Sequence, residues 1–104
     1  MKIYFAHPDT EVFIASLEKI TIAKVLRTVD LLEKFNYKLG PPHTKKITKD
    51  IFELRIRGQQ EVRLFYTFSH GTIIILRGFI KKTQQIPSKE LNLAIKRRIS
   101  LDTA

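Results

Sequence analysis

The hydrophobic spacing of this chain changes at residues 40–42 (Gly-Pro-Pro), and this change restricts the fold more than any other feature. Before it, apolar residues from Ile22 to Leu32 recur at helical spacing, which predicts an amphipathic helix. After it, residues 51–57 and 61–68 alternate apolar and polar side chains, which predicts strands with one face in a core. The chain must therefore combine helices with a sheet.

Shorter signals complete the predicted order of elements. Pro8 and Asp9 favour a helix start, and Pro87-Ser88 favours the cap of a C-terminal helix. Strands are predicted at residues 3–6, 51–57, 61–68 and 72–80, with short turns that make the last three antiparallel. We expect a single domain over residues 1–104 with an α+β fold in the order β-α-α-β-β-β-α. Its sheet is small, mainly antiparallel and four-stranded, with two N-terminal helices and one C-terminal helix.

The charge of the chain favours a nucleic-acid partner. Nineteen Lys and Arg against 10 Asp and Glu give a net charge of +9, an excess that attracts polyanions. From Arg77 to Arg98 the only anion is Glu90, so the positive charge is concentrated, as a binding site requires. The alternative is a basic surface with no specific ligand. The run of residues 96–98 (Lys-Arg-Arg) fits either a ribosomal RNA contact or a helix C-terminus that favours cations.

Other residue types limit the chemistry that the chain can perform. Cysteine is absent, which excludes disulfides and thiolate metal sites. His7, His43 and His70 lack the spacing of metal ligands, so we expect neither a metal nor a cofactor. The longest apolar run, residues 73–76, is far too short to cross a membrane, and we expect a cytoplasmic protein without membrane contact.

A group of charged residues shares the face of the predicted sheet opposite the core. Alternation places Glu53, Arg55 and Arg57 on this face beside Arg63 of the next strand, and Lys81 and Lys82 follow the last strand at its rim. Converging cations suit a phosphodiester and the negative charge that it gains during cleavage. The alternative is a solvated face with weak cross-strand ion pairs.

Further residues are candidates for RNA contact around this group. Phe65 and Phe79 fit the open face, where they would stack on bases. The additional RNA-binding candidates are Arg77 in the last strand and, in the loop before the second strand, His43, Lys45 and Lys46.

Three segments occur in an order that resembles the RelE/ParE toxin superfamily, and most closely its phage-derived, HigB-like branch. They are residues 51–57 (IFELRIR), 62–66 (VRLFY) and 78–87 (GFIKKTQQIP). The resemblance covers essentially the whole chain and implies a RelE-like fold. It also implies the toxin of a type II toxin–antitoxin system, a ribosome-dependent mRNA endoribonuclease that arrests translation. Cleavage would proceed by attack of the 2′-hydroxyl, without a metal ion.

The resemblance implies roles for individual residues. Arg63 matches the arginine that holds the scissile phosphate, and Lys82, with Lys81 beside it, matches the cationic position after the last strand. Arg55 stands where RelE-type enzymes have a lysine. Glu53 departs from the pattern, so its role as base or electrostatic partner is open. The predicted catalytic set is thus Glu53, Arg55, Arg63 and Lys82, with no general acid identified.

The resemblance also implies partners. They are mRNA on the ribosome, ribosomal RNA and a cognate antitoxin of the helix-turn-helix, HigA-like kind, in an oligomeric toxin–antitoxin complex. Two alternatives remain open from the sequence. One is a ParE-like DNA gyrase poison with the same fold, and the other is a non-catalytic, basic RNA-binding or ribosome-binding module.

Overall fold

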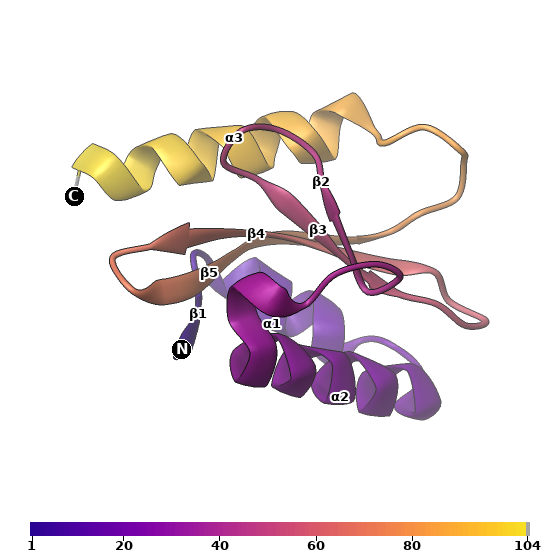
Figure 1. Ribbon diagram of the computed structural model, residues 1–104. Helices are drawn as coiled ribbons and strands as arrows, with labels where there is room; N and C mark the ends of the chain where they lie inside the picture. The colour runs from indigo at the N-terminus through magenta and orange to yellow at the C-terminus, as the bar shows by residue number, and fades with distance from the viewer. Residues whose placement is uncertain (104) are drawn as a thin grey trace.

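A computed structural model describes residues 1–103 as five strands and three α-helices (Figure 1). In chain order the elements are β1 (Ile3–Phe5), α1 (Pro8–Ala15), α2 (Lys19–Phe35), a short 3₁₀ turn η1 (Asn36–Lys38), β2 (Thr44–Lys46), β3 (Phe52–Ile56), β4 (Val62–Ser69), β5 (Thr72–Ile80) and α3 (Ser88–Thr103). The strands form one mixed sheet in the order β1-β5-β4-β3-β2. The α+β class and the three predicted helices are confirmed.

The prediction of four strands is wrong, because β2 adds a fifth strand at one edge. Its residues, Thr44, Lys45 and Lys46, show no alternation of apolar and polar side chains, so the sequence gives no strand signal there. The segment is a strand because it pairs antiparallel with β3, with Lys45 opposite Glu53. At the other edge β1 pairs parallel with β5, and the remaining pairs are antiparallel, as predicted.

Helices cover both faces of the sheet (Figure 1). The helices α1 and α2 pack on one face, where Val25 and Leu32 meet Leu54 and Leu64 in the larger core cluster. Gly78 permits this close packing, because a Cβ at this position would lie 2.8 Å from Leu64 and 2.9 Å from the ring of Phe13. The amphipathic spacing predicted for α2 therefore serves this face of the sheet.

The helix α3 covers part of the opposite face. Beneath it Phe65, Leu76 and Phe79 pack with Ala94 in a second buried cluster. A bulge in β5 leaves Leu76 without a partner on β4, because Phe65 lies opposite Arg77 and the next residue, Tyr66, lies opposite Ile75. The extra residue reverses the alternation of β5 and turns Phe79 toward α3.

Two local signals behave as the sequence predicts. The helix α1 begins at Pro8. Before it, Nδ1 of His7 caps the helix by accepting a hydrogen bond from the backbone N–H of Asp9 at 3.0 Å. At the β4–β5 turn both His70 and Gly71 have positive φ, the conformation of a tight two-residue hairpin turn. These two histidines therefore have local structural roles. Within residues 1–103, no helix has the length and apolar character needed to cross a membrane.

Candidate functional site

The uncovered part of the second sheet face forms a cationic hollow where β3 and β4 approach the segment after β5. Its volume is about 430 Å³. Its lining residues are Arg55, Arg57, Glu61, Arg63, Lys81, Lys82, Thr83 and Gln84. Strand pairing creates this convergence, because Arg55 lies directly opposite Arg63 and the backbone N–H of Lys81 donates to the carbonyl of Glu61 at 2.7 Å. The three arginines predicted on this face and the two lysines predicted at its rim thus line one hollow.

Arg63 is the most enclosed of these cations, with a side chain only 5% exposed. Its Nη1 donates to the carbonyl oxygen of Val62 at 3.0 Å, and its Nη2 donates to Oε1 of Glu61 at 3.1 Å. Its Nε is buried and has no hydrogen-bond partner among residues 1–103. The guanidinium is therefore fixed in orientation, as a residue that binds an oxyanion in one geometry must be.

Glu53 lies beneath the two arginines and is fully buried. Its Oε1 accepts a hydrogen bond from Nε of Arg55 at 3.1 Å and lies 3.7 Å from Nε of Arg63. Two arginines directly opposite each other would repel, so a carboxylate between them stabilises the pair. Within the described chain Oε2 of Glu53 has no hydrogen-bond partner. The buried position makes Glu53 a positioning residue for both arginines.

Glu61 is the second carboxylate of this region and, unlike Glu53, lines the hollow. Its Oε2 accepts the backbone N–H of Gly58 at 3.0 Å, and its Oε1 accepts the bond from Arg63. The bond from Gly58, then that from Arg63 and the charge of Arg57, hold the pKa of Glu61 below its usual value. Glu61 is therefore a carboxylate at neutral pH. Glu61 was not among the predicted site residues, although the period of two along residues 61–68 places it on the same face as Arg63.

A second hollow continues the cationic surface around β3 toward α2. Arg55 and Arg57 line it as well, together with Lys24 and Arg27 of α2 and His43. Neither Lys24 nor Arg27 was predicted as a site residue, because the apolar spacing of residues 22–32 places both on the side of the helix away from the core. Their three-residue spacing places them on one side of α2, and this was the available signal.

The remaining loop candidates lie farther around the sheet edge. Lys45 and Lys46 are exposed on β2 and line a third hollow with aromatic side chains, among them Tyr37 and Phe68, with Arg55 at its border. His43 lines the second hollow, and its carbonyl accepts the N–H of Arg55 at 2.8 Å. These three residues adjoin the cationic hollow without lining it.

The prediction that Phe65 and Phe79 stack on bases is wrong. The two rings lie 5.1 Å apart, centroid to centroid, with exposed fractions of 0% and 4%. They are enclosed because α3 packs over their part of the face, which alternation along the strands does not reveal. Tyr66 is also buried, in the core cluster on the opposite face of the sheet.

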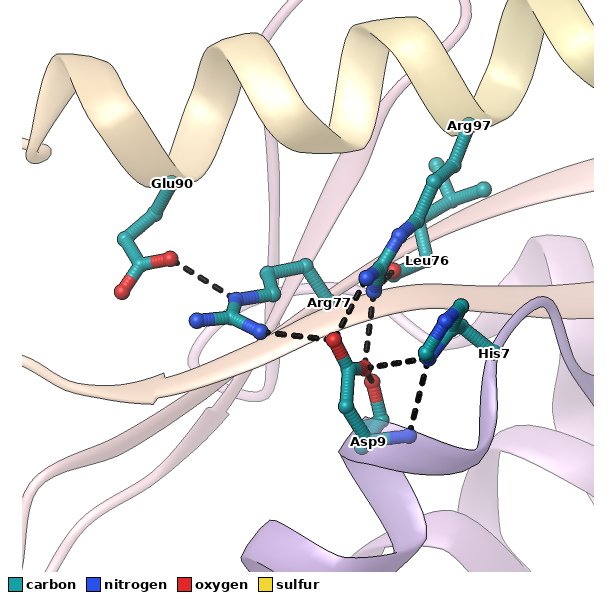
Figure 2. Close-up of polar contacts among 7 residues, drawn as sticks. His7, Asp9, Leu76, Arg77, Glu90 and Arg97 are labelled. Atoms are coloured by element: carbon teal, nitrogen blue, oxygen red, sulfur yellow. Dashed lines mark hydrogen bonds and ion pairs between the residues drawn. The ribbon is translucent and has the colours of Figure 1, made fainter.

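Arg77, another predicted RNA contact, is paired with acidic side chains (Figure 2). Its Nε donates to Oε1 of Glu90 at 2.7 Å, and its Nη1 donates to Oδ2 of Asp9 at 3.0 Å. Arg97 donates to the same Asp9 carboxylate and to the carbonyl of Leu76. The hydrogen bond from Arg97 is the main cause that lowers the pKa of Asp9 to about 2.

Part of the basic segment from Arg77 to Arg98 is therefore structural. Arg77 and Arg97 join α1, β5 and α3, and Arg98 is paired with Asp102 one helical turn away. Of the other cations in this segment, Lys81 and Lys82 line the hollow, whereas Lys89 and Lys96 are exposed on α3. Among residues 1–103, no group of three or more His, Cys, Asp or Glu side chains is arranged to hold a metal ion.

The fold and the cationic rim together define a small α+β domain of the RelE-like toxin fold. The family described as Phage derived protein Gp49-like (DUF891) matches residues 12–98. The chain belongs to this phage-derived, Gp49-like family, which falls generally within the RelE/HigB-like toxin superfamily. No curated protein matches the sequence.

Proposed function

We propose that this protein is the toxin of a type II toxin–antitoxin system and cleaves mRNA on the ribosome. The observation that carries the proposal is the hollow in which five cations surround a fixed, almost fully buried Arg63. Such a site neutralises a phosphodiester and the charge that it gains as a fifth oxygen approaches phosphorus. The superfamily to which the Gp49-like family belongs supports the same reading.

The geometry suggests how the residues divide the work. Arg63 and Arg55 bind the scissile phosphate, because guanidinium groups offer parallel hydrogen bonds to its oxygens and keep their charge. Glu53 keeps the two arginines in place from below. Lys82 and Lys81 lie across the hollow, where an ammonium group stabilises the leaving oxygen. Arg57 continues the positive surface toward α2 and holds the neighbouring RNA backbone.

Partners complete the proposal. Ribosomal RNA and mRNA are the polyanions that the net charge of +9 attracts. A helix-turn-helix, HigA-like antitoxin is the proposed inhibitor, in an oligomeric complex that closes the hollow. Action on ribosomes places the protein in the cytoplasm. The proposed antitoxin should be encoded by a small reading frame beside the gene. Co-expression of its product should suppress the growth arrest that this protein causes.

The test compares two variants in a translation reaction with mapping of mRNA 5′ ends. Arg63→Lys keeps a positive charge beside buried Glu53 but loses the planar fork, so we expect folding to persist and cleavage to fall about 10²–10³-fold. Lys89→Gln removes a charge from an exposed position on α3, outside the hollow, and should cut like the parent. If Arg63→Lys cleaves as fast as the parent, the proposed site is wrong. DNA damage with intact mRNA would favour the gyrase alternative. Ribosome binding with neither mRNA cleavage nor DNA damage would favour a non-catalytic module.

A further inference from the structure

The two glutamates near Arg63 differ in what can reach them. Glu53 is fully buried beneath the arginines, so a substrate hydroxyl in the hollow cannot contact its carboxylate. Glu61 is 37% exposed and lines the hollow. A group that removes a proton from a substrate must come within hydrogen-bond reach of it. Of these two carboxylates, only Glu61 meets this condition.

The other lining residues do not accept a proton at neutral pH. Arginine keeps its proton throughout, lysine is protonated unless it is deeply buried, and Thr83 and Gln84 are not basic. Within the part of the chain that the structure describes, Glu61 is the only carboxylate among the residues that line the hollow. It is therefore the one lining group able to act as a base.

Glu61 also occupies the position that a substrate phosphate needs. Arg63 offers Nη2 toward Glu61, while its Nη1 is used by the carbonyl of Val62 and its Nε is buried. A phosphate oxygen that takes this bond from Nη2 displaces Oε1 of Glu61. The carboxylate that it displaces remains tethered beside the phosphate, because Gly58 still holds its other oxygen.

We propose that Glu61 is the proton acceptor of the cleavage reaction, displaced from Arg63 by the scissile phosphate and then directed at the adjacent 2′-hydroxyl. This inference rests on the proposed RNA cleavage. The 2′-oxygen forms a bond to phosphorus as its proton passes to the Glu61 carboxylate. The bond between phosphorus and the 5′-oxygen breaks, and this oxygen takes a proton from the ammonium of Lys81 or Lys82. The products are a 2′,3′-cyclic phosphate and a 5′-hydroxyl, and solvent restores both side chains.

The charges around Glu61 fix the pH dependence. In the free protein Gly58 and Arg63 hold its pKa down, with Arg57 adding to the effect, while Arg55, Lys81 and Lys82 face it across the hollow. When phosphate takes Arg63, the carboxylate loses one of these interactions and gains an anionic neighbour, so its pKa rises. The cleavage rate of the bound complex should therefore decrease with acid, because protonated Glu61 accepts no proton.

The test separates binding from cleavage in Glu61→Gln. The carboxamide oxygen can still accept the N–H of Gly58 but cannot act as a base, so cleavage should fall about 10²–10⁴-fold. Binding of an uncleavable RNA with a 2′-O-methyl group at the cut should stay equal or become several-fold tighter, because no carboxylate competes for Arg63. Glu33→Gln, which removes an exposed charge on α2, is the matched control and should cut like the parent.

Each outcome distinguishes this inference from the proposed function. Partial cleavage by Glu61→Asp, and loss of the acidic decrease in rate in Glu61→Gln, would support a base. Unchanged cleavage in Glu61→Gln, with Arg63→Lys impaired, would overturn the role of Glu61 alone. Equal losses of binding and cleavage in Glu61→Gln would also overturn it, since they indicate a role in binding or structure. If the unmodified protein cuts no RNA, the proposed function and this inference fail together.

Discussion

Replacing Asp9 with asparagine should weaken the attachment of α3 to the rest of the fold. The Asp9 carboxylate accepts hydrogen bonds from Arg77 and Arg97, and the bond from Arg97 is the main cause that lowers its pKa from 3.8 to about 2. A shift of that size corresponds to about 2.4 kcal/mol at full strength. The side chain is 32% exposed, so solvent screening reduces this to about 1–1.5 kcal/mol. We expect Asp9→Asn to lower the free energy of unfolding by that amount at pH 7.

The pH dependence gives this prediction its test. The folded pKa of Asp9 is lowered, so its contribution is complete above the unfolded pKa near 4 and decreases as pH falls toward 2. Urea unfolding of Asp9→Asn and the parent should therefore differ at pH 7 and converge near pH 2. Glu11→Gln, another acidic residue of the first turn, controls for the helix dipole. Equal stability at pH 7, or a difference unchanged down to pH 2, would refute the reasoning.

Two further measurements follow from the fold and the hollow. Leu64→Ala should lower the free energy of unfolding by about 2–5 kcal/mol in thermal unfolding, because this fully buried side chain of β4 packs in the core beneath the helices. A loss below about 1 kcal/mol would contradict its place in the core. The affinity for RNA should fall with salt at a log–log slope of roughly −3 to −4, since about five phosphates would meet the five cations of the hollow. A slope near zero in a filter-binding titration would contradict an electrostatic site.

Much of the sheet could be predicted because the alternation of apolar and polar residues marks its strands in the sequence. Alternation along residues 51–57 and 61–68 identified which side chains face the core, and the turn at His70-Gly71 is tight enough to fix the β4–β5 hairpin. The strand β2 could not be predicted in this way. Its three residues are held by the hydrogen bonds of β3 rather than by a buried face of their own. Tertiary pairing of this kind leaves no periodic signal.

The candidate site was predictable to the same extent. Arg55, Arg63 and the two lysines converge because strand pairing brings them together, and alternation had placed them on one face. The environment of Phe65 was not predictable, since the apolar side of α3 does not indicate which part of the sheet it covers. The pairing of Arg97 with Asp9 joins residues 88 positions apart, beyond the reach of any local pattern.

These distant contacts also determine when the fold can be completed during synthesis. β1 pairs with Ile73 and its neighbours in β5, about 70 residues later in the sequence, and Asp9 pairs with Arg97 in α3. A nascent chain that emerges from its N-terminus cannot close this sheet, or cover Phe65 and Phe79, until almost all of it has been synthesised. Contacts of such long sequence separation also slow folding. The native fold, and with it the ordered hollow, should therefore form only after the chain as far as Arg97 has emerged from the ribosome.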